Sequence, residues 1–380
     1  MPREPNTRSD RLRAAALAAL LAATAAAAPL PRAGPAAARA PARAVLAPSF
    51  FPTWQARNVA FPFVLRVAGA YRMYYAGSGA AQFNDSVADQ WSTGLATSPD
   101  GWHWTAPDDY EPVLRGTRFA DGDVVEPARR ARFDALSAFG VSVVEAAPAG
   151  PARYFMYYTG WNGDDEPEGE GRARPVHFRI GLATSPDGRQ WTKREGTAGL
   201  GAVLGYDPGV AAESRAVGQP FVRREGAGYR MWYEAFDGVT WRIAGARSKD
   251  GLSWTREGVV LEPGGADAPD ALGARDPVVL QRRGRFELWY QGKGGAPPAV
   301  RVLRALSDDG RRWIKATGAV DLRLPAPLEG GEALHADSVL VEPDGACRVF
   351  FAREETRHRR TALGEAVSRG FRVFSVRVDP

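Results

Sequence analysis

The stretch 229–254, YRMWYEAFDGVTWRIAGARSKDGLSW, holds the pattern that decides the fold of this chain. Its last seven residues read S-x-D-G-x-x-W, and this string occurs four times, at 98–104, 185–191, 248–254 and 307–313. We expect a degenerate fifth copy at 368–370, followed by Phe371 and Phe374. Recurrence of this kind is the signature of a repeat architecture, so the chain is interpreted as five related units.

Two further elements keep register with this string. An aromatic run precedes each copy, at 71–75, 154–158, 229–233, 286–290 and 347–351. A short apolar element begins further upstream, at Pro62, Ser142, Pro220, Pro277 and Ser338. Each unit therefore reads as four short strands, with Asp-Gly marking a tight turn before the last one. Five such units predict an all-β, five-bladed β-propeller with four antiparallel strands per blade over residues 49–380.

The N-terminus predicts export. Residues 1–28 combine four arginines with an alanine-rich apolar run, which is typical of a secretory signal peptide, and the Pro/Ala-rich residues 29–48 read as a linker. Residues 1–48 hold seven arginines and two acids, which accounts for the whole net charge of +5, so 49–380 is formally neutral. We therefore expect no nucleic-acid partner, no membrane attachment after signal cleavage, and a monomer that is secreted or periplasmic. Cys347 is the single cysteine, which excludes an intrachain disulfide.

The geometry of a propeller indicates where a site would form. The first strand of each blade lines the axis and the second runs antiparallel to it, so the start of one and the end of the other meet at one mouth of the channel. The residue before the aligned Pro or Ser is Phe61, Val141, Gln219, Asp276 and Asp337 in turn, and Glu234 directly follows an aromatic run. Carboxylates near an axis are costly to bury unless paired or used. We expect Asp276, Asp337 and Glu234 to be catalytic; an axial salt bridge or a strand cap is the competing interpretation.

Other residues near the same mouth are candidates for substrate binding, namely Arg275, His335, Gln219, Asp237, Trp161, Trp241 and Asn58. Weaker candidates stand in the connections, namely Asn84, Asp85, Glu126, Asp164 and Asp165. A second acidic slot, held by Asp134, Glu213 and Asp270, recurs upstream of three first strands, which favours a structural role. The four histidines follow no metal-binding spacing. We expect no cofactor and no catalytic metal, while an axial structural ion such as calcium stays open.

The pattern Y-R-M-W-Y-E-x-F-D-G at 229–238, followed by R-I-x-x-A-x-S-x-D-G-x-x-W at 242–254, resembles the five-bladed propellers of the glycoside hydrolase superfamily. That group spans the arabinanase/xylosidase (family 43), invertase/levansucrase (families 32 and 68) and mannoside phosphorylase (family 130) types. The resemblance covers roughly residues 50–380. It implies three carboxylates at the mouth: a base or nucleophile Asp from blade 1, a second Asp on an inner strand and a general-acid Glu.

Two features qualify what this resemblance implies. Arg275-Asp276-Pro277 is similar to the R-D-P motif of the invertase type, whose Asp holds sugar hydroxyls and stabilises the transition state, but it stands in blade 4 rather than blade 2. Blade 1 reads NVAFP at 58–62, with no acid where the family places one. The usual carboxyl pair must then come from Asp276, Asp337 and Glu234.

Three functions remain open at this point. The first is a secreted glycosidase-like enzyme acting on an oligo- or polysaccharide, whose two carboxyls would lie about 5–5.5 Å apart for retention or roughly 6.5–9.5 Å apart for inversion. The second is a non-catalytic propeller that binds glycan or protein through the same mouth. The third is a glycoside phosphorylase, with phosphate held by Arg275, His335, Lys293 and Arg353; export from the cytosol counts against it.

Overall fold

The computed structural model describes residues 34, 36–38, 40–48, 54–55, 58–79, 91–106, 111–117, 132–147, 149–163, 177–295, 299–322, 334–361 and 364–379, with backbone alone at 354–361 and 364–371. The expected signal peptide, and Asn84, Asp85, Glu126, Asp164 and Asp165, lie outside these residues. Among the described residues, no helix has the length and apolar character needed to cross a bilayer.

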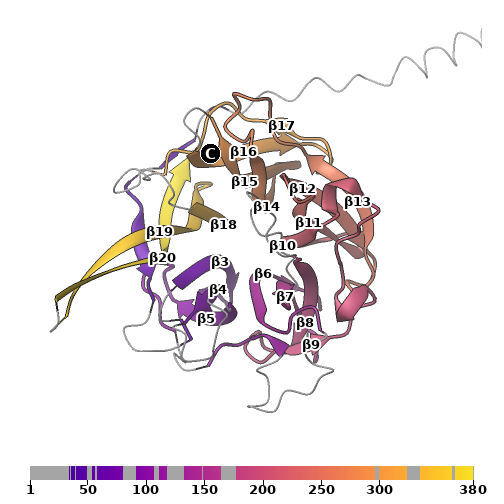
Figure 1. Ribbon diagram of the computed structural model, residues 1–380, viewed down its shortest axis with the longest axis horizontal. Helices are drawn as coiled ribbons and strands as arrows, with labels where there is room; N and C mark the ends of the chain where they lie inside the picture. The colour runs from indigo at the N-terminus through magenta and orange to yellow at the C-terminus, as the bar shows by residue number, and fades with distance from the viewer. Residues whose placement is uncertain are drawn as a thin grey trace, which may run out of the picture. The chain divides into compact units, whose positions relative to one another are not determined.

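Five antiparallel sheets surround a common axis (Figure 1), which confirms the predicted propeller. Blade 1 holds β3 (Asn58–Val67), β4 (Ala70–Ser78) and β5 (Ser92–Ser98). Blade 2 holds β6 (Ser137–Glu145), β7 (Tyr154–Trp161), β8 (Arg179–Ser185) and β9 (Thr192–Arg194). Blade 3 holds β10 (Ala216–Glu225), β11 (Gly228–Phe236), β12 (Trp241–Ser248) and β13 (Thr255–Leu261). Blade 4 holds β14 (Gly273–Arg282), β15 (Arg285–Gly294), β16 (Ala299–Ser307) and β17 (Ile314–Lys315).

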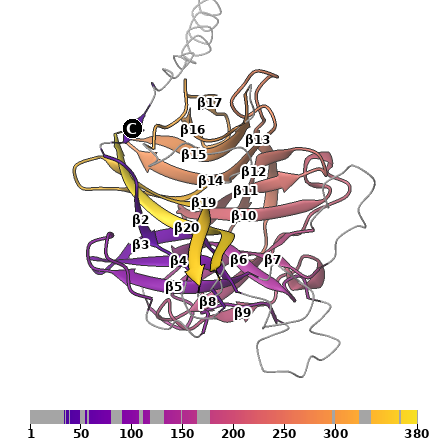
Figure 2. The ribbon, with the colours of Figure 1, turned by 60° about the vertical axis from the view of Figure 1, so that its left-hand side comes forward.

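Blade 5 closes the ring and corrects the predicted linker. Its strands β18 (Leu334–Val341), β19 (Cys347–Thr361) and β20 (Gly364–Asp379) are joined by two N-terminal strands, β1 (Ala37–Ala38) and β2 (Arg43–Leu46), which pair with β20 (Figure 2). Part of 29–48 is therefore the outer edge of the last blade. The linker prediction was wrong there because alanine-rich segments of low complexity carry no strand periodicity, although a neighbouring edge can pair with any backbone.

The S-x-D-G string forms the turn between the third and fourth strands, on the face opposite the mouth. In blade 3, Ser248 Oγ accepts a hydrogen bond from Gly251 N at 2.8 Å, and Asp250 Oδ1 accepts from Leu252 N and Ser253 N, both at 2.8 Å. Gly251 adopts a φ of 79°, which a residue with a Cβ rarely takes. The turn also joins neighbouring blades, since Tyr157 of blade 2 donates its hydroxyl to Gly251 O at 2.9 Å.

The tryptophan that follows each turn packs against the aromatic run of the preceding blade. Trp254 meets Tyr157 at 5.5 Å between ring centroids, and Trp191 meets Tyr74 at 5.8 Å. Around the closure, Trp104 of blade 1 meets Phe350 of blade 5 at 5.8 Å. The aromatic runs and tryptophans are therefore inter-blade core, which is the burial that a single blade cannot achieve alone.

The recurrent acidic slot has the structural role predicted for it. In blade 4 the buried Asp270 accepts from Tyr290 Oη at 3.0 Å and from Lys315 Nζ at 2.5 Å. Blades 2 and 3 repeat this cluster with Asp134, Tyr158 and Lys193, and with Glu213, Tyr233 and Arg256. Each acid thus fixes the connection that enters its blade to the second and fourth strands.

The expected fifth S-x-D-G copy at 368–370 was wrong. In blade 5, Cys347 pairs with Val378, whereas in blade 3 the first residue of the aromatic run, Tyr229, pairs with Ser248. The position equivalent to the repeat serine is therefore Val378, ten residues beyond Ser368. Residues 368–370 lie instead in β20, where they pair with 355–357 in a long extension of the β19–β20 hairpin.

A candidate active site at the channel mouth

Each inner strand carries a β-bulge at the mouth, and this irregularity builds the site. The ladder shifts between Ala60 and Phe63, Phe139 and Ser142, Gly218 and Phe221, Arg275 and Val278, and His335 and Ser338. The first bulged residue has a positive φ in four blades: 50° at Phe61, 57° at Gly140, 43° at Gln219 and 50° at Asp276. Non-glycine residues adopt this conformation at a cost of about 1–3 kcal/mol, and such strain clusters at functional sites.

The bulges also correct the alignment of the five units. The residues that occupy the first bulge position are Phe61, Gly140, Gln219, Asp276 and Ala336, and the second position holds Pro62, Val141, Pro220, Pro277 and Asp337. The predicted slot was therefore one residue off in blades 2 and 5. Asp276 and Asp337 take different places in their bulges, although they come from neighbouring blades.

Asp276, His335 and Asp337 converge at the axis. One oxygen or nitrogen of each lies within 4.8 Å of the others. His335 Nδ1 is 2.7 Å from Asp276 Oδ2, and it must carry the proton because a carboxylate can only accept. Asp276 Oδ1 and Asp337 Oδ2 are buried and have no hydrogen-bond partner among the described residues. The structure thus brings together two of the three predicted carboxyls with two acceptor oxygens unused.

Glu234 lies beside them but is fully engaged. Its side chain is completely buried and accepts from Arg275 Nε at 3.2 Å and Arg275 Nη2 at 3.0 Å. Glu234 Oε1 also accepts from the backbone N–H of Asp276 at 2.8 Å, so it holds the bulge of the next blade. Arg275 in turn lies over Trp241, with Cζ 4.3 Å from the ring centroid, and Trp241 stacks on Phe236 at 4.3 Å.

Other blades make a similar contact from the end of the second strand to the inner strand of the next blade. Thr159 occupies the position after its aromatic run that Glu234 occupies in blade 3, and its hydroxyl accepts from Gln219 N at 2.8 Å. Gln291 occupies the same position in blade 4; its Nε2 donates to Leu334 O and lies 3.3 Å from His335 Nδ1. We had not predicted Gln291, although the residue directly after each aromatic run was the signal that identified Glu234.

The surroundings of the three carboxyls shift their pKa values in different ways. Burial, together with the negative charges of Asp276 and Glu234, holds the pKa of Asp337 well above its usual value, although Arg275 opposes this. Burial alone would raise the pKa of Asp276, but His335 and Arg275 outweigh it and hold that pKa below its usual value. Burial raises the pKa of Glu234 to about 7 against the pull of Arg275. The surroundings therefore favour the ionised form of Asp276 and the protonated form of Asp337.

The opposite side of the mouth is aromatic. Phe61 lies 4.7 Å from the His335 ring and 5.5 Å from both Trp91 and Phe139 between ring centroids. Phe139 contacts Phe178 at 5.6 Å. The axial cavity between the two sides measures about 20 Å³, room for about one water molecule. It is lined by Phe61, Phe63, Gly140, Val141, Gln219, Pro220, Phe221, Asp276, Pro277 and Asp337.

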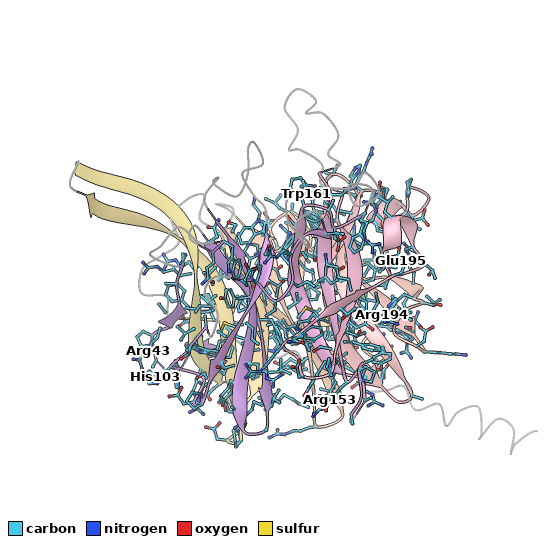
Figure 3. All side chains as sticks on the ribbon, turned by 90° about the horizontal axis from the view of Figure 1, so that it is seen from below. Arg43, His103, Arg153, Trp161, Arg194 and Glu195 are labelled. Carbon is cyan, nitrogen blue, oxygen red and sulfur yellow. The ribbon has the colours of Figure 1, made fainter. Side chains whose placement is uncertain are left out.

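The remaining predicted binding residues are distributed around this mouth. Asp237 closes the β11–β12 turn, because its carboxylate accepts from Val239 N and Thr240 N, both at 2.7 Å, and pairs with Arg242. Asn58 is buried and donates to Ser78 Oγ at 2.7 Å. Trp161 ends β7 at the mouth, and Arg153 marks the opposite end of that hairpin (Figure 3). Gln219 lines the cavity, while Asp237 and Asn58 are committed to the scaffold.

The mouth supplies some of the ligands that a cation would need. Calcium takes six to eight oxygen ligands, and the unused oxygens of Asp276 and Asp337 supply two of them. His335 Nδ1 is engaged with Asp276, so it is not free to ligate in this arrangement. The residues fit a hydrated ion held by the two carboxylates, and the axial ion stays a prediction.

Comparisons with known proteins agree with the fold. No protein-family model matches the chain. Two uncharacterized proteins of Mycobacterium tuberculosis, from strains H37Rv and CDC 1551 / Oshkosh, are each 28% identical over 278 residues, covering 71% of this chain and 79% of theirs.

Solved structures of glycoside hydrolases are similar over most of the chain. A glycosyl hydrolase from Bacteroides ovatus aligns with a TM-score of 0.59 and 16% identity, covering 90% of this chain and 93% of its own. A structure from family 130, a family of mannoside phosphorylases that contains glycoside hydrolases targeting β-1,2 mannosidic linkages in Candida mannan, aligns with a TM-score of 0.58 and 17% identity, covering 90% of this chain and 95% of its own. A thermostable family 43 hydrolase aligns at 0.51 and 14%, covering 86% and 94%. The chain therefore shares the five-bladed propeller fold of the glycoside hydrolases that the sequence resembles.

Proposed function

We propose that this chain is an exported enzyme that hydrolyses glycosidic bonds, with Asp276 and Asp337 as its working carboxyls. The observation that carries the proposal is the Asp276–Asp337 pair: two carboxyl groups from adjacent blades, within 4.8 Å of each other, whose surroundings favour opposite protonation states. Carboxyls whose pKa values are pushed apart in this way are the acid and the base of glycosidase chemistry. The propeller fold shared with glycoside hydrolases is consistent with it.

The chemistry follows from the protonation states. Asp337 donates its proton to the leaving glycosidic oxygen, and the ionised Asp276 attacks the anomeric carbon as the bond to that oxygen breaks. Water then cleaves the glycosyl ester, giving its proton to Asp337 and its hydroxyl to the sugar. The separation within 4.8 Å is near the roughly 5–5.5 Å of retaining enzymes and short of the 6.5–9.5 Å that an inverting water requires. We therefore expect retention of configuration.

Glu234 and Arg275 act as positioning residues in this mechanism. Three hydrogen bonds already occupy Glu234, one of them from the Asp276 backbone, so it fixes the strained bulge that presents the nucleophile. Arg275 lies between Glu234 and the face of Trp241. Neither of the Glu234 carboxylate oxygens is left without a partner, in contrast to Asp276 and Asp337.

The two sides of the mouth suit the two faces of a sugar. The cavity of about 20 Å³ is too small for a sugar ring, so the reacting ring would lie above it. Its apolar C–H face would pack on the cluster of Phe61, Trp91 and Phe139, while its oxygens would face Asp276 and Asp337.

A non-catalytic glycan-binding propeller is the second candidate, and one observation favours it. Blade 1 carries Phe61 in its bulge and no acid at 58–62, where the resemblance implies a base or nucleophile Asp. A phosphorylase has less support, because two donor nitrogens of Arg275 are already bonded to Glu234. Secretion or a periplasmic location, and a monomeric state, belong to the proposal as well; cleavage near residue 28 and the mass in solution test them.

The test is a screen of the purified chain against aryl arabinosides, xylosides, galactosides and mannosides and against fructans, with the anomeric product followed by NMR. Asp276→Asn and Asp337→Asn should each lower kcat by about 10²–10⁴-fold, because each removes one partner of acid–base catalysis. Asp308→Asn, an exposed aspartate distant from the mouth, is the matched control and should leave kcat unchanged. Equal hydrolysis by all four proteins would refute the site. Glycan binding without hydrolysis, abolished by Asp276→Asn, would establish the binding module instead.

A further inference from the structure

The propeller does not dictate which side chain stands at the first bulge position. The five blades carry Phe61, Gly140, Gln219, Asp276 and Ala336 there, so residues of very different size and polarity fit this backbone. Gly140 adopts its φ of 57° without strain, whereas Gln219 takes a φ of 43°, which a residue with a Cβ adopts only at a cost. The fold alone therefore gives no reason for a glutamine in blade 3.

Blade 2 holds Gln219 in place. The Gln219 side chain lies directly over Gly140, where a Cβ would clash with Gln219 Oε1 and would stand 2.7 Å from Gln219 Cδ. The backbone N–H of Gln219 donates to Thr159 Oγ1 at 2.8 Å. Glycine in the bulge of blade 2 thus leaves room for the amide of blade 3, and both the backbone and the side chain of Gln219 are positioned.

The amide of Gln219 has no partner within the protein. Its side chain is 8% exposed, and neither Oε1 nor Nε2 makes a hydrogen bond to any described residue. The two other buried glutamines of the described chain are bonded, since Gln55 accepts from Tyr75 Oη at 2.6 Å and Gln291 donates to the backbone of β18. Burying an amide without a partner is costly, so we expect the Gln219 amide to bind a group from outside the chain.

The axial cavity defines the size and charge of that group. Gln219 lines it together with Asp276 and Asp337, and the other lining residues are uncharged. Its volume of about 20 Å³ admits one group of the size of water. Two carboxyls in the same lining disfavour an anion. An amide offers an acceptor oxygen beside two donor hydrogens, which matches a hydroxyl, because a hydroxyl also donates and accepts.

We propose that Gln219 binds one hydroxyl of the reacting sugar, which enters the axial cavity from above, and that this contact selects the sugar. The inference rests on the proposed function, because that function places the sugar ring over the cavity. It deepens that function by naming what the substrate must carry, a free hydroxyl directed toward the axis. A methyl or acetyl group on that hydroxyl should prevent binding, because the cavity has no room for further heavy atoms.

The first experiment measures the binding of methyl arabinofuranoside, xyloside, galactoside, mannoside and fructofuranoside by NMR titration. All proteins carry Asp337→Asn, which removes the proton donor and keeps a neutral side chain of similar shape. Each monodeoxy derivative of a sugar that binds is titrated as well. Gln219→Leu should weaken binding of the complete sugar by about tenfold or more, and loss of one particular hydroxyl should weaken parent binding to the same extent. The two losses should not add, because both remove the same hydrogen bond.

A second measurement separates binding from folding. Because the Gln219 amide has no partner in the chain, Gln219→Leu should keep the melting temperature within about 1 °C of the parent or raise it. The matched control Gln291→Leu removes a bonded amide at the same mouth and should lower the melting temperature by about 2 °C or more. An equal decrease in both variants would show that Gln219 supports the ring, and would overturn the proposal.

The titration also distinguishes this inference from the proposed function. If sugars bind but Gln219→Leu weakens the complete sugar and every monodeoxy derivative alike, Gln219 recognises no particular hydroxyl, and the inference fails while the proposed function stands. If none of the sugars binds, both fail together. If calcium raises the melting temperature of wild type but not that of Gln219→Leu, the amide serves an ion and the proposal is overturned.

Discussion

Glu234 should make the folded chain less stable as the pH rises from 5 to 8. Burial raises its pKa to about 7 in the folded protein, against 4.5 for the ordinary group. Between these two values the folded chain retains a proton that the unfolded chain has released, so stability falls with increasing pH. The difference between about 7 and 4.5 corresponds to about 3 kcal/mol, fully present below pH 4.5 and lost once the pH has passed 7. Asp337, whose pKa is also raised, should add to the loss with the same sign.

The assay compares wild type with Glu234→Gln by urea unfolding at several pH values, followed by the fluorescence of the tryptophans. Glutamine keeps an oxygen that can accept from the Asp276 backbone but cannot titrate, so its absolute stability is not the readout. The decrease in the free energy of unfolding between pH 5 and pH 8 should be smaller in the variant by about 3 kcal/mol. Glu195→Gln, at an exposed carboxylate, supplies the matched control. If wild type and Glu234→Gln lose stability in parallel across this range, Glu234 does not hold a proton in the folded chain and the electrostatic reading of the mouth is wrong.

Two further predictions concern the scaffold. Lys315→Met leaves the buried Asp270 without its cation and should lower the free energy of unfolding by about 3–5 kcal/mol; urea titration measures it, and Lys315→Arg should recover most of the loss if charge is the cause. Removal of residues 34–48 strips β1 and β2 from β20, and should lower the melting temperature by about 5 °C or more. An unchanged calorimetric melt would show that the N-terminal strands do not hold the ring closed.

The sequence was sufficient to predict the ring of blades but not the strands that complete blade 5. S-x-D-G-x-x-W encodes a local device, in which Ser248 and Asp250 bind nearby backbone groups, so it can be read wherever it occurs. The fourth strand of blade 5 comes from the other end of the chain, and no local pattern marks Arg43–Leu46 as its partner. The fifth motif at 368–370 was assigned from its residue types alone. The pairing of β19 with β20 determines the register, and it places the equivalent position at Val378.

The convergence of Asp276, Asp337 and Glu234 was predictable because it follows from strand direction alone. The different environments of the three were not, since they depend on bulges that shift the register by one residue in blades 2 and 5. A proline after Phe61, Gln219 and Asp276 is the visible trace of the bulge, but Gly140 and Ala336 occupy the same position without one. Glu234 was therefore grouped with the reactive acids, although its hydrogen bonds assign it the same inter-blade contact that Thr159 makes.

The carboxyls at the mouth lie on one side of the axis only. Phe61 and Gly140 leave blades 1 and 2 without a carboxyl in the bulges, while Asp276 and Asp337 supply both of the unused acceptor oxygens from blades 4 and 5. A glycan bound across the axis would then meet its proton donor and its nucleophile on one side only, with aromatic rings opposite.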